Sequence, residues 1–307
     1  MSDARALLIG EALIDIVPGQ PANQELPGGS PMNVAITLGR LGRPAELAAW
    51  IGRDARAGAI RDHLAASGVA LAPGGDGAPR TSTASVRLDA SGQAQYVFDF
   101  EWDFHPPARA GDFALVHTGS LATVIEPGAA KVAAFFQGLA EAPETAPTLT
   151  YDPNLRPALA PPPEVLRPAV EALVAAADVV KASDEDLRLL YPDRDPAAVG
   201  RDWAEAGPAL VVLTRGGAGA LAFAGPIALN AQAKNSAVVD TVGAGDTFMG
   251  GLIDGLWSLG LIGPANRPRL RAISETQLLW AMDRAAAAAA VTVSRAGADP
   301  PWASELL

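Results

Sequence analysis

Short apolar runs rich in Val, Ile and Leu alternate along this chain with longer, helix-like segments. Continuous apolar runs are typical of strands buried on both faces, and glycines that close periodic segments are typical helix stops. We expect helices over 33–42 and 55–68, and strands over residues 6–17, 45–52, 113–119, 148–154, 177–183 and 209–216. This alternation predicts βαβ units and an α/β fold whose mostly parallel sheet is covered on both faces.

One segment, Thr81 to Phe104, departs from this alternation. Polar and apolar residues alternate on both sides of an Ala-Ser-Gly turn, which predicts a β-hairpin and not a crossover helix. Two interpretations stay open on the pattern alone. The hairpin is either a flap over a binding site or an antiparallel edge of the main sheet.

Composition excludes several classes of protein. A net charge of −11 argues against nucleic-acid binding and against docking on anionic lipid. The absence of cysteine excludes disulfides, thiolate metal sites and cysteine nucleophiles. The N-terminal residues lack the basic start and the long apolar region of a secretory signal, and no apolar stretch reaches the ~18 residues of a membrane span. We therefore expect a cytoplasmic protein.

The stretch VVDTVGAGDTFMGGLIDGL, from Val238 to Leu256, carries the strongest functional signal. Apolar residues recur every four positions after residue 245, which predicts a helix that begins at the glycine-rich residues 243–245. The first N–H groups of a helix lack partners inside it, and small residues let an anion approach them, so this loop is a candidate phosphate site.

Asp246 stands just behind that loop. An acid in the first turn of a helix favours the helix dipole by a few tenths to ~1 kcal/mol. Alternatively, it takes a proton from a hydroxyl group that attacks the phosphate, which would explain an acid beside an anion site. Spacing alone leaves both interpretations open.

Other nucleotide-binding motifs do not fit this chain. None of its lysines follows a glycine, so there is no P-loop. Gly217, Gly219 and Ala222 match a dinucleotide fingerprint, but the residues that follow are strand-like where that fingerprint requires a helix. The segment RGGAGA is more simply a tight glycine turn between two strands.

Two segments, DTVGAGDTFMGGL and GGSPMNVAITLGRLG (Gly28 to Gly42), resemble the signatures of a known family, the ribokinase-like (PfkB) sugar kinases. The first resembles the C-terminal signature of that family, and the second resembles its N-terminal signature. Further matching segments occur in family order over nearly the whole chain: GEALIDIV, WIGRDARAG, YDPNLRP, SDEDL, LTRGGAGA and VTVSRAGA.

The resemblance implies a three-layer αβα fold with a small β-sheet lid. It makes residues 1–307 a single kinase domain, with the lid formed mainly by about 12–34 and 81–105. It also implies transfer of a phosphoryl group from ATP to a sugar hydroxyl. Asp246 is then the general base, and the backbone N–H groups form the anion hole, at Gly243, Ala244 and Gly245.

The resemblance also implies the sugar site. The family analogues of Asp15, Gly28, Gly29 and Asn33 bind sugar, and these groups suit hydrogen bonds to a ring of hydroxyls. Without the resemblance, Asp15 would more simply end a strand and Asn33 would cap the helix that follows it.

The nucleotide end is implied by three further segments. Asn154 and Arg156 match a family segment near the phosphates, where an arginine suits phosphate geometry, although a solvated turn would also explain them. Ser183 and Asp186 stand where the family often has the motif N-x-x-E, which in the family is associated with Mg²⁺ and its waters. The resemblance also implies that the glycine turn lies near the nucleotide, so four more residues are expected to bind ATP: Thr214, Gly216, Gly217 and Gly219.

Two features leave the ions and the nucleotide open. Some relatives bind a monovalent cation through oxygens at the positions of Asp240, Thr241, Ser294 and Gly297, so activation by K⁺ is one option. Ala286 stands where the family often has an asparagine near the adenine, so that contact is expected to be absent.

Within the family, the segments match fructokinases best, so we expect an ATP-dependent fructokinase. The alternatives are a 2-dehydro-3-deoxygluconate kinase, a ribokinase or nucleoside kinase, and a non-catalytic sugar or nucleotide sensor. An acidic sugar would need an extra arginine, for which Arg87 is the candidate. The expected partners are a small sugar and ATP, with neither nucleic acid nor membrane; a homodimer is a family-level option.

Overall fold

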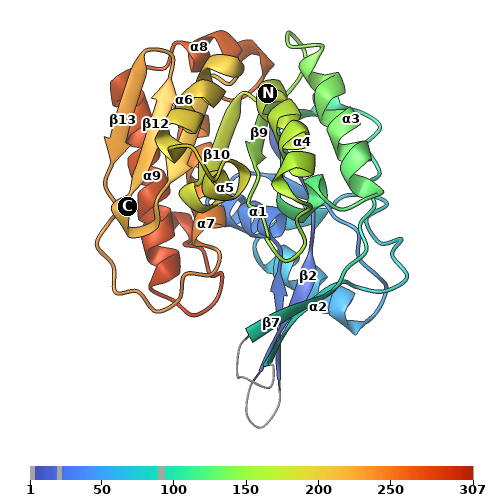
Figure 1. The fold of residues 1–307 in the computed structure, drawn as a ribbon. Helices are drawn as coiled ribbons and strands as arrows, with labels where there is room; N and C mark the ends of the chain where they lie inside the picture. Colours follow the sequence, from blue (N-terminus) through green and yellow to red (C-terminus); the bar gives the residue numbers. More distant parts are fainter. Residues whose placement is uncertain (1–3, 19–22, 89–93, 307) are drawn as a thin grey trace.

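The computed structural model describes residues 4–18, 23–88 and 94–306, and its strands form two sheets of different size (Figure 1). The large sheet has nine strands in the order β13-β12-β11-β10-β9-β8-β1-β4-β5. The strands from β11 to β5 are parallel, and β12 and β13 are antiparallel additions at one edge. Their bounds are β1 Arg5–Ile9, β4 Ala45–Ala48, β5 Val69–Leu71, β8 Phe113–Gly119, β9 Thr148–Asp152, β10 Val179–Ser183, β11 Leu210–Thr214, β12 Ala220–Ala224 and β13 Ile227–Ala231.

Helices cover both faces of the large sheet, so the predicted three layers are confirmed (Figure 1). One apolar core joins the sheet to α1 Ser30–Arg40, α2 Ala55–Ala66, α7 Ala244–Ser258, α8 Arg267–Arg271 and α9 Glu275–Val293. The other joins it to α3 Gly128–Ala140, α4 Pro163–Ala176, α5 Asp184–Leu190 and α6 Pro196–Ala206. In the described part of the chain, no helix is both long and apolar enough to cross a membrane.

The single strand expected over residues 6–17 is wrong. The chain leaves β1 at Gly10 and starts a new strand, β2 Leu13–Val17, in the small sheet. Gly10 has φ 154°, and a Cβ atom there would lie 2.3 Å from the ring of Pro31 in α1. The break therefore depends on close packing against a helix that is remote in sequence, which the apolar run itself does not encode.

The small sheet contains the predicted hairpin. It has the order β3-β2-β6-β7, with β3 Gln24–Gly28, β6 Thr83–Leu88 and β7 Ala94–Asp99. β6 and β7 are antiparallel, and β6 pairs with β2 and not with the large sheet, so the interpretation as an edge of the main sheet is wrong. The predicted Ala-Ser-Gly turn lies outside the described residues. The small sheet projects from the body of the molecule (Figure 1).

The order of the large sheet creates one point where ligands are expected. β1 has β4 on one side and β8 on the other, so the chain winds away from β1 in both directions. Ligands of open α/β sheets bind outside the carboxyl ends of strands at such a switch point. The loops after β1, β8, β9, β10 and β11 therefore meet at the edge where a site is expected.

Candidate active site

The glycine loop and the start of α7 have the predicted geometry. Gly243 is the N-cap residue and has φ 73°, in the left-handed region that favours glycine. A Cβ atom on Gly243 would also lie 2.5 Å from the Cβ atom of Ala298. The N–H group of Ala244 donates to the carbonyl of Thr241 at 3.3 Å, so this member of the predicted anion hole already has a partner.

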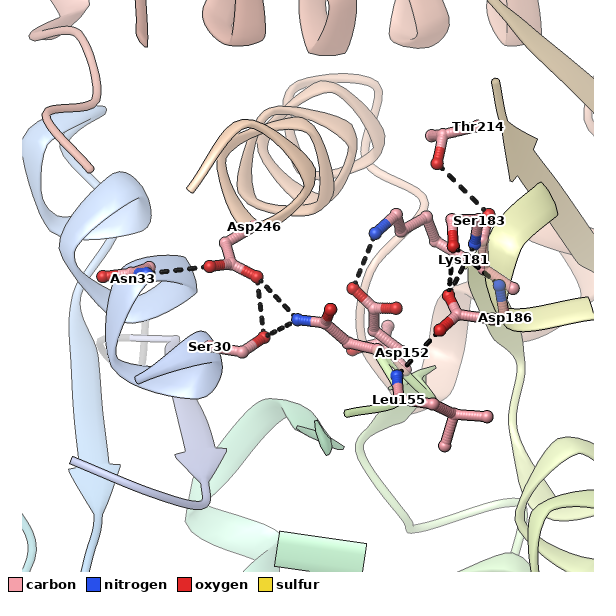
Figure 2. Close-up of polar contacts among 12 residues, drawn as sticks. Ser30, Asn33, Asp152, Leu155, Lys181, Ser183, Asp186, Thr214 and Asp246 are labelled. Atoms are coloured by element: carbon pink, nitrogen blue, oxygen red, sulfur yellow. Dashed lines mark hydrogen bonds and ion pairs between the residues drawn. The ribbon is translucent and has the colours of Figure 1, made fainter. Parts of the chain in front are cut away.

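Asp246 is held by uncharged donors (Figure 2). Ser30 Oγ donates to its Oδ1 at 2.7 Å, and Asn33 Nδ2 donates to its Oδ2 at 2.8 Å. Asn154 Nδ2 also donates to Oδ1, at 3.1 Å. The residue is 5% exposed, and among the described residues it has no ion pair. The carboxylate is thus fixed in orientation while no partner neutralises its charge.

These donors come from separate parts of the chain. Ser30 and Asn33 lie in the first turn of α1, and Asn154 follows β9. Ser30 Oγ accepts a hydrogen bond from Asn154 Nδ2 at 2.7 Å, and Arg156 Nη1 donates to Asn154 Oδ1 at 2.6 Å. Arg156 therefore orients the amide of Asn154 so that its N–H groups face the carboxylate. Ser30 was not predicted as a site residue, because its only signal in the sequence is its place between Gly29 and Pro31 at the start of a helix.

The residues predicted to bind sugar lie next to this cluster. Asp15, in β2, reaches across to β3, where a Cβ atom on Gly28 would lie 2.1 Å from its Oδ2. A Cβ atom on Gly29 would lie 2.4 Å from the carbonyl oxygen of Glu11. Burial raises the pKa of Asp15 to about 6, and the positive charge of Arg156 acts in the opposite direction. The amide nitrogen of Asn33 faces Asp246 and donates a hydrogen bond to it.

Ser183 and Asp186 are hydrogen-bonded to each other in the structure. They form the capping box of α5, in which Asp186 Oδ2 accepts from Ser183 N at 2.8 Å and from Ser183 Oγ at 2.7 Å. Asp186 Oδ1 accepts from Leu155 N at 2.7 Å (Figure 2). Within the described residues, no three acidic or imidazole side chains are grouped to hold a metal. These residues therefore do not fit a protein-built Mg²⁺ cage.

The segment after β11 is the tight turn that the sequence predicts. Gly216 to Ala218 form a 3₁₀ turn, and the chain continues into β12, not into a helix. Gly219 has φ 84°, and a Cβ atom there would lie 2.1 Å from the carbonyl oxygen of Ala231. Thr214 Oγ1 donates to Ala182 O at 3.3 Å, and Gly217 lies within the turn.

The residues predicted for a monovalent cation are brought together only in part. Asp240 Oδ2 accepts from Gly297 N at 2.8 Å, and its Oδ1 accepts from Val242 N at 3.0 Å. These hydrogen bonds, the one from Val242 first, hold the pKa of Asp240 below its usual value. Thr241 is exposed next to it, and Ser294 Oγ donates instead to Val291 O at 2.7 Å.

Two expected residues add nothing polar to the described site. Ala286 is a buried residue of α9 and offers no side-chain hydrogen bond to an adenine. The side chain of Arg87 lies outside the described part of the structure.

Comparisons with known proteins show the family to which this chain belongs. The family model described as "pfkB family carbohydrate kinase" matches residues 4–305. A fructokinase of Rhizobium leguminosarum bv. trifolii is 31% identical over 262 residues, which cover 81% of this chain and 79% of that protein.

Solved structures show the same fold. The fructokinase of Xylella fastidiosa with bound ATP has a TM-score of 0.83 and 24% identity, and the match covers 100% of this chain and 97% of that one. A double mutant of Vibrio cholerae O395 fructokinase, with fructose, ADP and potassium ion bound, has a TM-score of 0.77 and 27% identity over 97% of this chain and 94% of that one.

Proposed function

This chain belongs to the pfkB family of carbohydrate kinases, and we propose that it transfers a phosphoryl group from ATP to a hydroxyl group of D-fructose. The sugar is suggested by the fructokinase of R. leguminosarum bv. trifolii and by the V. cholerae structure, which contains fructose and ADP. The observation that carries the mechanism is the placement of Asp246, a buried carboxylate held by uncharged donors beside a helix start.

In the proposed reaction, Asp246 takes the proton of the attacking sugar hydroxyl. The hydroxyl oxygen forms a bond to the terminal phosphorus of ATP, and the bond from that phosphorus to the bridging oxygen of ADP breaks. The N–H groups at Gly243, Ala244 and Gly245 would face the charge on the transferred group, with that of Ala244 released from the carbonyl of Thr241. Donors aimed at such charge contribute most in phosphoryl transfer.

The sugar lies, in this proposal, between the small sheet and the start of α1. Asp15 and the backbone of Gly28 and Gly29 supply hydrogen-bonding groups, and Asn33 has an amide oxygen in addition to the nitrogen that faces Asp246. The small sheet, whose strands lie within about 12–34 and 81–105, acts as the lid that excludes water during transfer.

The nucleotide binds on the other side of Asp246. Arg156 and Asn154 lie near its phosphates, and the glycine turn that follows Thr214 lies near the rest of the nucleotide. Mg²⁺, if bound, would be held mainly by the phosphates of ATP, since no described group of acidic or imidazole side chains could hold it, and it would neutralise part of their charge. The K⁺ site remains part of the proposal and is tested by the dependence of turnover on potassium.

Release of ADP across a panel of sugars tests this function. We expect D-fructose to be turned over faster than ribose, a nucleoside or 2-dehydro-3-deoxygluconate at equal low concentration. Asp15→Ala should raise the KM of the sugar roughly 5- to 150-fold, because an unpaired buried polar group costs about 1–3 kcal/mol, while the KM of ATP changes little.

Three other outcomes of these experiments would each change a different part of the proposed function. Faster turnover of 2-dehydro-3-deoxygluconate would keep the kinase and change the sugar. Sugar binding without ADP release from any member of the panel would indicate the non-catalytic sensor. An unchanged sugar KM in Asp15→Ala would show that the proposed pocket is misplaced.

A further inference from the structure

Lys181 is a buried lysine for which the proposed mechanism has no role. It lies in β10, and its side chain is 3% exposed. By contrast, Lys131 and Lys234 are 45% and 41% exposed and form ion pairs at the surface. Burying an ammonium group is unfavourable unless it is paired and hydrogen-bonded, so its position needs a physical reason.

The ammonium group of Lys181 lies against the glycine loop. Its Nζ donates to Asp152 Oδ2 at 2.9 Å (Figure 2). On its other side, a Cβ atom placed on Gly245 would lie 3.1 Å from Nζ. An ammonium has three N–H donors, and among the described residues Asp152 is its only hydrogen-bond partner, so two donors remain beside the loop.

The pair with Asp152 is not closed on itself. Asp152 Oδ1 is buried and has no hydrogen-bond partner within the described part of the chain. Burial raises the pKa of Asp152 to about 7, and the charge of Lys181 acts in the opposite direction. A pair whose only task was structural would be expected to satisfy both carboxylate oxygens.

The negative charges near Lys181 are a further reason for a cation beside Gly245. Burial disfavours its charged form, but its pKa is raised because the carboxylates of Asp152, Asp186 and Asp246 surround it. Three acids at the mouth of an anion site would repel a polyphosphate, since like charges in a poorly solvated site interact strongly. A fixed ammonium at Gly245 offsets that repulsion where the phosphoryl group is expected.

We propose that Lys181 is a catalytic residue whose ammonium group contacts the phosphoryl group during its transfer. The inference rests on the proposed function. Lys181 stays protonated and forms no covalent bond; it donates hydrogen bonds to the phosphoryl oxygens from the side opposite Asp246. The anion hole is then built from an ammonium as well as from backbone N–H groups. Gly245 is small because a side chain there would separate the two.

The test removes the buried pair as a unit. Lys181→Met alone leaves Asp152 uncompensated, so it is combined with Asp152→Asn, which preserves the shape of both side chains. We expect the double variant to bind ADP as the wild type does, with little change in the KM of the sugar. Its kcat should fall at least ~10²-fold, the usual loss when one stabilising donor is removed. A kcat within about threefold of wild type would show that Lys181 only balances Asp152.

Asp152→Asn alone is the matched control, because it keeps the ammonium. We expect its kcat to stay within about tenfold of wild type; a loss as large as that of the double variant would overturn the proposal. If the double variant does not fold, Lys181→Met with Asp152→Leu replaces it, since well-packed apolar residues substitute for buried pairs. Wild-type enzyme without sugar-dependent ADP release would overturn the proposed function itself, whereas an active wild type with an equally active double variant would overturn only the role of Lys181.

Discussion

Helix α7 carries two buried aspartates that are held in opposite ways. Asp246, in its first turn, is 5% exposed and accepts hydrogen bonds from Ser30, Asn33 and Asn154. Asp254, two turns later, is fully buried and is paired with two arginines. Arg43 Nε donates to its Oδ1 at 2.6 Å, and Arg284 Nε donates to its Oδ2.

The difference separates a structural acid from one that is available for chemistry. The two guanidinium groups neutralise Asp254 and join α7 to α9 and to the segment after α1. The donors around Asp246 fix its direction without cancelling its charge. The same residue type on one helix therefore has two different environments, which are set by its hydrogen-bond and ion-pair partners. Four substitutions test this difference.

Asp254→Ala should have the largest effect, and that effect should be on stability. It leaves Arg43 and Arg284 without their buried partner, and breaking such a pair costs about 3 kcal/mol of the free energy of unfolding; this is the low end of the usual range, since both arginines reach solvent. Denaturant unfolding measures the loss, and kcat of the folded fraction should be retained. Asp283→Ala, which removes an exposed partner of Lys234, should cost at most ~1 kcal/mol.

Asp246→Asn should have the next largest effect, and it should be on turnover. The amide keeps the size of the side chain and cannot accept the sugar proton, so kcat should fall at least ~10²-fold. The free energy of unfolding should change by only about 1 kcal/mol, because one neutral donor loses its acceptor. Near-wild-type turnover by the folded variant would remove the assignment of Asp246 as base.

Ser30→Ala should have a smaller effect of the same kind. The hydroxyl of Ser30 donates to Asp246 and accepts from Asn154, so its loss loosens the carboxylate without removing it. A neutral hydrogen bond contributes ~1 kcal/mol, which corresponds to a roughly fivefold fall in kcat. Steady-state kinetics should show this fall with an unchanged KM for ATP. An effect confined to the KM of the sugar would place Ser30 in the sugar site instead.

Asp15→Asn should change the stability of the protein in a way that depends on pH. Burial raises the pKa of Asp15 from its ordinary 3.8 to about 6, so the folded protein binds this proton more tightly than the unfolded chain does. Stability from this group is therefore complete below about pH 4 and is lost as the pH rises through about 6. The variant should melt at a higher temperature than wild type at pH 8, and this advantage should vanish at pH 4. A constant difference in Tm across that range would contradict the raised pKa.

Much of the fold could be predicted from local patterns. The strand β8 was predicted from its continuous apolar run, and the strands of the hairpin from Thr81 to Phe104 from their polar-apolar alternation. The helix after Gly245 was predicted from its apolar spacing. The strand expected over residues 6–17 failed because its break depends on Gly10 packing against Pro31. Local periodicity does not contain a contact of that kind.

Asp246 and its glycine loop could be identified from the sequence alone. The start of a helix can be predicted from consecutive residues, here small residues followed by an apolar repeat. Its unpaired N–H groups follow from the geometry of any helix. The sequence therefore predicts where an anion site would lie and which acid would stand beside it.

The partners of each polar group there could not be predicted from the sequence and are seen only in the folded chain. Asp246 meets Ser30 and Asn154, and Lys181 reaches Gly245, across separations in sequence that no local pattern spans. Asp186 is held in a capping box, and Asp254 is neutralised by arginines from two other segments. The charge and orientation of a side chain depend on whichever groups packing brings within hydrogen-bond distance, and that packing is a property of the whole folded chain.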